Sequence, residues 1–269
     1  MVNLVNDPLI AFFVFLFGLI IGSFLNVCIV RMPQEKSVVF PGSHCVRCQK
    51  PIPWYDNIPL ISYLLLLGRC RFCKEKISIR YFIVELLTGI AFVLFYLVFG
   101  LTGKLLVYLI LLSGLIISTF IDIEHRIIPD EISLGGIVVG LIFSFLIPGL
   151  HDTSSHFMSL GKSLLGVLIG GGCIYAMGLL GDFLFKKESM GGGDVKLLAM
   201  IGAFLGWKLA LLTFFVAPLF GAVVGIIVKI RTKDSLIPYG PFLALAAIIS
   251  LFWSKPLIDW ILSGYGLYR

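Results

Sequence analysis

Charged residues are scarce in this sequence: only 13% of its 269 residues are Asp, Glu, Lys or Arg, whereas 59% are hydrophobic. A soluble globular domain carries about 25% charged residues. The composition therefore excludes an ordinary soluble protein and indicates an integral membrane protein. The chain also lacks internal repeats and low-complexity tracts, which argues against repeat architectures and disordered polymers.

Signals of several other classes are missing as well. No G-x-G-x-x-G follows a predicted strand, so no cofactor fold of that kind is visible. No histidine stands in a G-x-S-x-G or Cys/His context, which disfavours a serine or cysteine nucleophile. Residues 1–7 contain no Lys or Arg. The first apolar run therefore lacks the basic region of a cleaved signal peptide, and we expect it to be retained.

Apolar runs divide the chain into about eight membrane spans, because a helix needs about 20 residues to cross a bilayer. The runs lie at residues 9–30, 81–100, 104–121, 132–149, 161–185, 195–206, 209–228 and 236–253. The sixth run is short and ends at Gly206, Trp207 and Lys208, which predicts a tilted or partly inserted helix with interfacial anchors. The predicted fold is an all-α polytopic membrane protein.

The basic residues predict the orientation of these spans. Of the 21 Lys and Arg residues, 16 lie in four alternate loops, at residues 31–80, 122–131, 185–196 and 229–234. The positive-inside rule places these loops in the cytoplasm and both termini outside. Asp122 and Asp194 then emerge on the cytoplasmic side. We expect three parts: a first span in residues 1–30, a cytoplasmic loop domain in residues 31–80 and a membrane core in residues 81–269.

The 31–80 loop is the only sizeable soluble segment. It holds nine basic and three acidic residues, so its charge equals the net charge of +6 of the whole chain. A basic patch beside a membrane favours anionic lipid headgroups. A loop of this size between two spans gives no support to a nucleic-acid role. We therefore expect membrane lipid as a partner and no nucleic acid.

Two C-x-x-C pairs in this loop predict a metal site. The four cysteines are Cys45, Cys48, Cys70 and Cys73. Thiolate pairs at this spacing form tetrahedral zinc sites with four sulfur ligands. The alternative is a set of disulfides or redox pairs, and a reducing cytoplasm disfavours disulfides. Because four cysteines leave no open coordination position, we expect a structural zinc that staples the loop rather than a catalytic one.

Two carboxylates stand at the ends of apolar runs. Asp122 closes one run, and Asp194 follows the three glycines Gly191, Gly192 and Gly193 at the start of another. An ionisable group at a helix centre costs about 2.5–3.5 kcal/mol, so such residues are candidates for function. Two carboxylates that share a proton can hydrolyse a peptide bond as an acid and base pair. The pair titrates as a unit, so neither role is assigned to either residue.

The three glycines lack a Cβ that would keep another backbone away. We therefore interpret Gly191, Gly192 and Gly193 as a turn along which an unwound substrate chain can approach Asp194. The alternative is a plain glycine loop in which Asp194 is the N-cap of the next helix.

Other carboxylates are expected to have structural roles. Asp130 and Glu131 precede the fourth span, in a first-turn position where acids complement the helix dipole. Asp182 and Glu188 flank the glycine turn, where they can assist, but they have lysines nearby as partners.

A proton-coupled transporter is the alternative function, with Asp122 and Asp194 as proton relays. It predicts acidic residues deep in the spans and paired broken helices in two similar halves. Here both carboxylates lie at span ends on one predicted side, and no repeat is present. A zinc-bearing scaffold without activity would leave Asp194 and its glycines unexplained.

Six motifs accompany these residues: GSFLNV at 22–27, WYDNIP at 54–59 between the C-x-x-C pairs, ISIRY at 77–81 running to Glu85, IPD at 128–130, GGGDVK at 191–196 and IPYGPF at 237–242. With them the chain resembles, over nearly its full length, the type IV prepilin peptidases, which are bifunctional leader peptidases and N-methyltransferases of bacterial pilus, competence and type II secretion systems.

The resemblance implies that Asp122 and Asp194 are the catalytic aspartates of a G-x-G-D intramembrane aspartyl protease. It implies prepilin or pseudopilin substrates, cut on the cytoplasmic side of the bacterial inner membrane. It also implies methylation of the new N-terminus from S-adenosylmethionine, for which residues 31–80 are the candidate part. That activity rests on the resemblance alone, and the residues that bind S-adenosylmethionine are not identified.

Overall fold

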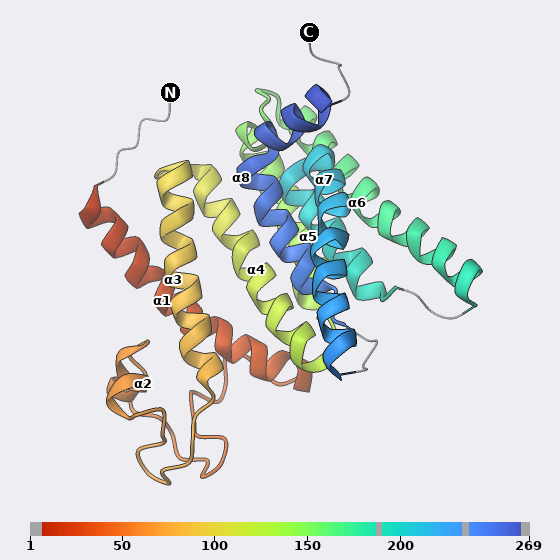
Figure 1. Ribbon diagram of the computed structural model, residues 1–269. Coiled ribbons are helices and arrows are strands. Elements are labelled where there is room, and N and C mark those ends of the chain that lie inside the picture. The colour runs from red at the N-terminus through yellow and green to blue at the C-terminus, as the bar shows by residue number, and fades with distance from the viewer. Residues whose placement is uncertain (1–6, 187–189, 233–236, 265–269) are drawn as a thin grey trace. The chain divides into compact units, whose positions relative to one another are not determined.

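A computed structural model describes residues 7–186, 190–232 and 237–264. The chain divides into two compact units, residues 1–117 and 118–269, and the boundary lies inside helix α4 (Gly103–His125). The described residues form helices and no strands; their only β contacts are two isolated bridges in the cysteine-bearing loop (Figure 1). The predicted all-α fold class is confirmed.

The long helices follow the predicted apolar runs. They are α1 (Pro8–Arg31), α3 (Ile79–Phe99), α4, α5 (Asp130–Leu146), α6 (His156–Phe185), α7 (Gly192–Thr232) and α8 (Gly240–Gly264). Shorter elements are α2 (Ile61–Leu65) and the 3-10 turns η1 (Met32–Gln34), η2 (Trp54–Asp56) and η3 (Pro148–His151). The predicted starts of the first and last spans are near those of α1 and α8. Residues 1–6 and 265–269 lie outside the described part. The side of the membrane on which the termini lie stays a prediction.

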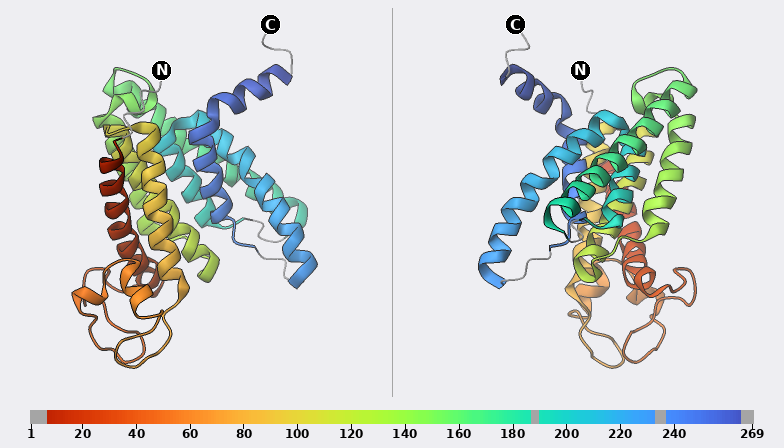
Figure 2. Two further views of the ribbon diagram at one scale, coloured as in Figure 1. Left: turned by 60° about the vertical axis from the view of Figure 1, so that its left-hand side comes forward. Right: turned by 90° about the vertical axis from the view of Figure 1, so that its right-hand side faces the viewer.

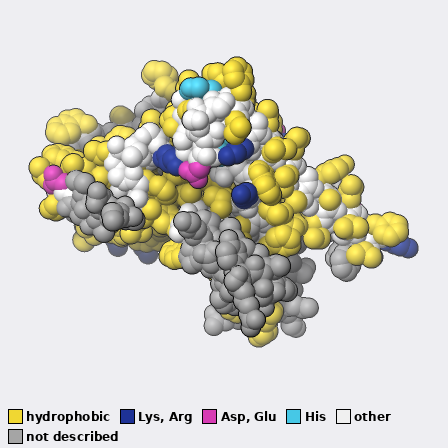
Figure 3. Space-filling view, turned by 90° about the horizontal axis from the view of Figure 1, so that it is seen from above, with side chains coloured by type: hydrophobic (Ala, Val, Ile, Leu, Met, Phe, Trp, Pro, Cys, Tyr) yellow, Lys and Arg dark blue, Asp and Glu magenta, His cyan; other side chains and the backbone are white. Residues whose placement is uncertain are grey.

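Within the described residues, five helices are long and apolar enough to cross a membrane, and α8 adds a shorter apolar segment over Gly240–Trp253. Many of their large hydrophobic side chains are exposed, including Leu168 at 69% and Phe215 at 62%. Hydrophobic side chains cover much of the described surface in Figure 3. Apolar surface of this extent indicates contact with lipid, as expected for a multi-pass membrane protein.

Local sequence signals set the starts of several helices. The Asp7 side chain accepts a hydrogen bond from the Leu9 N–H at 2.9 Å, and Pro8 occupies the first turn of α1. Ser78 and Ser155 cap α3 and α6 in the same manner. These residue types are preferred N-caps because their side-chain oxygens satisfy N–H groups that have no partner inside the helix.

In the first unit, α1 and α3 approach closely through small residues. A Cβ on Gly18 would lie 2.8 Å from the Cα of Gly89, and a Cβ on Gly22 would lie 2.8 Å from the Cα of Glu85. Glycines four residues apart let membrane helices pack backbone to backbone. Asn26, one turn further, donates its side-chain amide to a backbone carbonyl at the start of α3, at 3.0 Å.

In the second unit, α7 bends at Gly206, where φ is 78° and ψ is 171°. Such a φ favours glycine, which has no Cβ to clash. The two arms, residues 192–205 and 207–232, run in different directions from the bend (Figure 2). The predicted sixth and seventh spans are therefore two arms joined directly, and Trp207 and Lys208 lie at the bend between them.

Candidate active site and metal centre

Asp122 lies in the last turn of α4, which continues to His125. Its side chain is only 6% exposed. Oδ2 of Asp122 accepts a 2.8 Å hydrogen bond from the backbone N–H of Gly240, the first residue of α8. The positive charge of Arg126, the residue that follows α4, also acts on it. A buried carboxylate needs such partners, because burial without them costs several kcal/mol.

Asp194 lies in the first turn of α7 and is half-buried. It is the third residue of that helix rather than its N-cap. Its N–H donates to the carbonyl oxygen of Gly191 at 3.1 Å, and a Cβ on Gly191 would lie 3.4 Å from Oδ2 of Asp194. The helix dipole favours an acid in this turn, so the local structure tolerates a charge here but does not need Asp194 as a cap.

The two carboxylates lie near enough for the charge of Asp122 to act on Asp194. A third segment reaches the same place, because the residue before α8 is Tyr239. The charge of Asp194 also acts on the Tyr239 phenol. The structure gathers two carboxylates and a phenol from α4, α7 and the segment before α8.

The three glycines before Asp194 differ in what surrounds them. A Cβ on Gly193 would lie 3.1 Å from the Cβ of Ile128, whereas a Cβ on Gly192 would meet nothing within 4 Å. None of the three has a positive φ, so their small size matters more than their backbone freedom. Only Gly192 faces open space. At Gly193, the packing of Ile128 leaves little room for a larger residue.

Asp130 and Glu131 lie in the first turn of α5, as predicted. Oδ1 of Asp130 also forms an ion pair with Nζ of Lys196 at 2.7 Å. This contact, which the sequence did not predict, ties the start of α5 to the start of α7. Asp182 lies within α6, and Glu188 falls outside the described residues.

The four cysteines of the two C-x-x-C pairs converge in the first unit. Their sulfur atoms all lie within 4.8 Å of one another, and Sγ of Cys45 is 3.8 Å from Sγ of Cys73. A tetrahedral zinc with Zn–S bonds of about 2.3 Å places its sulfurs about 3.8 Å apart, whereas a disulfide bond measures about 2.05 Å. All four are free thiols. The geometry fits four sulfur ligands around one metal.

Both C-x-x-C pairs use the same backbone turn. The first cysteine of each pair donates its N–H to the carbonyl oxygen five residues later, at 3.0 Å for Cys45 and 2.8 Å for Cys70. The residue after each pair is left-handed, with φ of 57° at Gln49 and 58° at Lys74. Backbone hydrogen bonding, chiefly from Cys73, lowers the pKa of Cys70 to about 7. This favours the thiolate form of Cys70, whereas desolvation and the neighbouring thiols raise the pKa of Cys73 to about 11.

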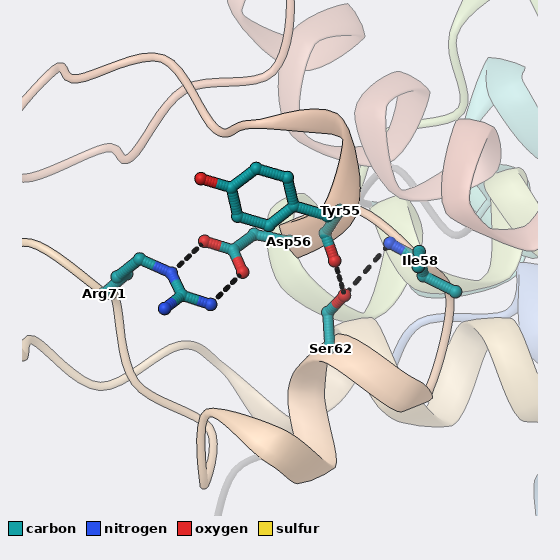
Figure 4. A network of polar contacts seen from close by, with 5 residues as sticks. All are labelled: Tyr55, Asp56, Ile58, Ser62 and Arg71. Carbon is teal, nitrogen blue, oxygen red and sulfur yellow. Dashed lines mark hydrogen bonds and ion pairs between the residues drawn. The ribbon is translucent and has the colours of Figure 1, made fainter.

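The WYDNIP motif connects the middle of the loop to the second cysteine pair. Asp56 accepts two hydrogen bonds of 2.6 Å from the guanidinium of Arg71, which lies between Cys70 and Cys73 (Figure 4). The guanidinium also stands 5.6 Å from the centre of the Tyr55 ring. Hydrogen bonding to Arg71 and its charge hold the pKa of Asp56 below its usual value. The sequence alone gave no role to this pair.

Glu85 attaches the loop to α3. Its side chain is buried, and Oε2 accepts a 2.8 Å hydrogen bond from the N–H of Leu60. Leu60 has a φ of 59°, which is uncommon for a residue with a side chain. The buried carboxylate therefore stabilises a turn that leucine does not favour.

The second half of the chain, residues 109–226, matches the type IV leader peptidase family, and residues 16–99 match the bacterial peptidase A24 N-terminal domain. A prepilin leader peptidase/N-methyltransferase of Aeromonas salmonicida is 35% identical over an alignment of 278 positions, gaps included, which covers 93% of each chain. The chain belongs to the type IV leader peptidase family. The four cysteines lie in its N-terminal domain match, and Asp122 and Asp194 lie in its peptidase match.

Further members of the family resemble the chain to a similar degree. A prepilin leader peptidase/N-methyltransferase of Pseudomonas aeruginosa is 36% identical over an alignment of 270 positions, gaps included, which covers 90% of each chain. One of Myxococcus xanthus is 41% identical over 225 residues, covering 84% of this chain and 65% of the relative. No solved structure gave a significant match.

Proposed function

We propose that the chain is a membrane-embedded aspartyl endopeptidase that removes the leader from type IV prepilin-like proteins and methylates the new N-terminus with S-adenosylmethionine. Its relatives are named for both activities. The observation that carries the peptidase half is the approach of Asp122 and Asp194 from α4 and α7. A proton-coupled transporter has no support among these relatives, whose names describe prepilin processing.

The chemistry needs no covalent intermediate. One carboxylate takes a proton from a water molecule while the water oxygen attacks the scissile carbonyl carbon. The other, protonated carboxyl donates its proton to the carbonyl oxygen. The tetrahedral intermediate then breaks at the C–N bond, with the proton passing to the leaving amine. Asp122 and Asp194 act as one unit in these steps.

The reaction has a direct test in the purified full-length protein. Incubation with a prepilin and S-adenosylmethionine is expected to give a product whose mass has lost the leader and gained one methyl group. The two mass changes report the two activities separately. An unchanged prepilin mass would contradict the peptidase, and a cleaved product without added mass would contradict only the methyl transfer.

We assign prepilin or pseudopilin substrates, a site on the cytoplasmic face of the inner membrane, and an outside location of both termini. The basic loops support this orientation through the positive-inside rule. A prepilin presents an apolar helix whose bond to be cut lies near the membrane interface, so its backbone must be unwound. Exposed backbone at that depth is tolerated only where protein or water satisfies it. Of the three glycines Gly191, Gly192 and Gly193, Gly192 at the start of α7 faces open space and offers such an edge near Asp194.

Gly192→Val is expected to reduce cleavage about 100-fold, because its side chain enters the open space beside Asp194 and displaces the substrate backbone. Turnover and thermal melting of the full-length protein would be compared with those of Gly135→Val, a glycine of α5 that also has nothing within 4 Å of its Cβ position. Equal turnover in both variants would remove the substrate-approach role.

Two other glycines of α7 would give a less clear result than Gly192. Valine at Gly193 would meet Ile128, and the Cβ position of Gly202 is occupied by the backbone of Gly166. Loss of activity in either variant would report packing as well as substrate approach.

We further assign a structural zinc to Cys45, Cys48, Cys70 and Cys73. The four sulfurs would hold the ion in a closed tetrahedral site, which stabilises the loop and leaves no position for substrate. The methyl donor is S-adenosylmethionine, and residues 31–80 are proposed to carry that activity.

The same loop offers a contact for anionic lipid. A cavity of about 510 Å³ is lined by Leu65, Leu66, Leu67, Arg69, Cys70 and Lys74. Leu65 and Leu67 are 78% and 83% exposed, and two cations but no carboxylate line the cavity. Apolar side chains next to cations suit an anionic headgroup and its upper acyl chain.

Arg69→Gln is expected to weaken phosphatidylglycerol binding to the full-length protein about fivefold, because one cation near a membrane surface contributes about 1 kcal/mol. Native mass spectrometry with added lipid measures the change. Lys36→Gln, in the same loop but outside the cavity, where Nζ bonds to Gln34, serves as the control. An equal effect of both substitutions would indicate only the general charge of the loop.

A further inference from the structure

The Asp122 carboxylate also joins α4 to the start of α8. The N–H of Gly240 donates to its Oδ2 at 2.8 Å across a sequence separation of 118 residues, and both residues are buried. The first N–H groups of a helix have no acceptor within the helix. Asp122 supplies that acceptor for α8, and α8 in turn fixes the direction of the carboxylate.

Residue 240 has no room for a side chain. A Cβ built on Gly240 would lie 2.8 Å from Oδ2, 3.3 Å from Cγ and 3.4 Å from Cβ of Asp122. A non-bonded heavy atom is essentially never found within 3.0 Å of a Cβ atom. The atom that would have to move is the carboxylate oxygen itself. Any residue other than glycine at this position therefore displaces the Asp122 carboxylate.

The backbone on either side of Gly240 is anchored, so that its N–H has a fixed direction. The N–H of Phe242 donates to the carbonyl oxygen of Tyr239 at 3.1 Å, and the two rings stand 6.5 Å apart. Both rings lie against the second arm of α7, since a Cβ on Gly221 would be 3.5 Å from Phe242 and 3.7 Å from Tyr239. The turn is thus held between α7 and the Asp122 carboxylate.

We propose that Gly240 is a positioning residue of the peptidase, an inference that rests on the proposed catalytic role of Asp122. Its N–H orients the carboxylate, and its missing side chain leaves the space that the carboxylate occupies. The IPYGPF motif is then the third part of the active site, beside the motifs that carry Asp122 and Asp194. Gly240 acts through Asp122 in the chemical step and not in prepilin binding.

Gly240→Ala is expected to lower kcat for prepilin cleavage about 100-fold while KM stays within about twofold of the wild-type value, because a displacement of about 1 Å in a reacting group has an effect of this size. A prepilin peptide with a hydroxyl-bearing carbon in place of the scissile carbonyl would occupy the position between both aspartates. We expect the inhibition constant of this peptide to rise, which means weaker binding, while the affinity for uncleaved prepilin stays unchanged.

A second variant removes the donor without adding bulk. Cell-free translation that places glycolic acid at position 240 turns the amide into an ester, which has no N–H and no side chain. Loss of a hydrogen bond to a charged group predicts a fall in kcat of about 10- to 100-fold. If Gly240→Ala proves to be unfolded, this ester variant still tests whether the Gly240 N–H positions the Asp122 carboxylate.

Gly221→Ala is the matched control, because its Cβ makes only ordinary contacts with the same turn; we expect its kcat to stay within about twofold of wild type. An equal loss in this variant, a loss confined to KM, or an ester variant with wild-type kcat would each overturn the proposal. If Asp122→Asn is inactive while both Gly240 variants are fully active, only this inference fails. If Asp122→Asn is active, the proposed catalytic role of Asp122 fails with it.

Discussion

Asp122→Asn and Asp194→Asn are each expected to abolish leader cleavage, with a loss of at least about 10⁴-fold, in a protein that remains folded. Neither carboxylate can relay protons alone, so the double variant should be no worse than either single one, as is found for groups that act as a unit. Cleavage of a purified prepilin, followed by mass, measures the loss. Substantial cleavage by either single variant would refute the assignment.

The control for this experiment must lose a carboxylate without entering the site. Asp130 does not serve, because its ion pair with Lys196 connects α5 to the helix that carries Asp194. Glu131→Gln makes the same chemical change at an exposed position in the first turn of α5. We expect it to keep its activity within about twofold, with at most a small loss of helix-dipole stabilisation.

Each Cys→Ser substitution at Cys45, Cys48, Cys70 or Cys73 is expected to remove the zinc and loosen the whole 31–80 loop to a similar degree. Structural zinc supplies about 10–16 kcal/mol in small domains, so its binding is largely the folding free energy of such a segment. Elemental analysis of protein purified without chelator should find about one zinc per chain, and proteolysis within the loop should accelerate in every variant.

Cys173→Ser, which changes a cysteine of α6 outside the cluster, should leave both measurements unaltered. Wild-type protein without stoichiometric zinc would refute the metal site. If the loop carries the methyl transfer, methylation should fail in the four variants while cleavage persists at least in part, since the aspartates belong to the other unit.

Residues that act through near neighbours could be predicted from the sequence. Each C-x-x-C pair forms its own tight turn through local hydrogen bonds, so the spacing already selects the four cysteines that converge. Apolar runs long enough for a membrane likewise indicated α1, α3, α4 and α6 to within a few residues. Asp122 and Asp194 could be selected because a carboxylate next to an apolar run is costly.

The contacts that orient these groups could not be predicted, because they join residues far apart in the chain. The N–H of Gly240 reaches Asp122 across 118 residues, and Lys196 reaches Asp130 across 66. Gly193 had the same local appearance as Gly192, yet only Gly193 packs against Ile128. Nothing in the local sequence distinguishes a glycine that faces open space from one that faces a neighbouring side chain.

Composition and local spacing by themselves determined that this protein lies in a membrane, where its helices run and which residue types can carry chemistry. These properties depend on hydration and on hydrogen bonds within a few residues. The tertiary structure alone decided that α7 bends at Gly206, that Arg71 binds Asp56 and that the start of α8 holds Asp122. These features depend on helix packing, which brings together groups whose separation along the chain carries no information about their distance in space.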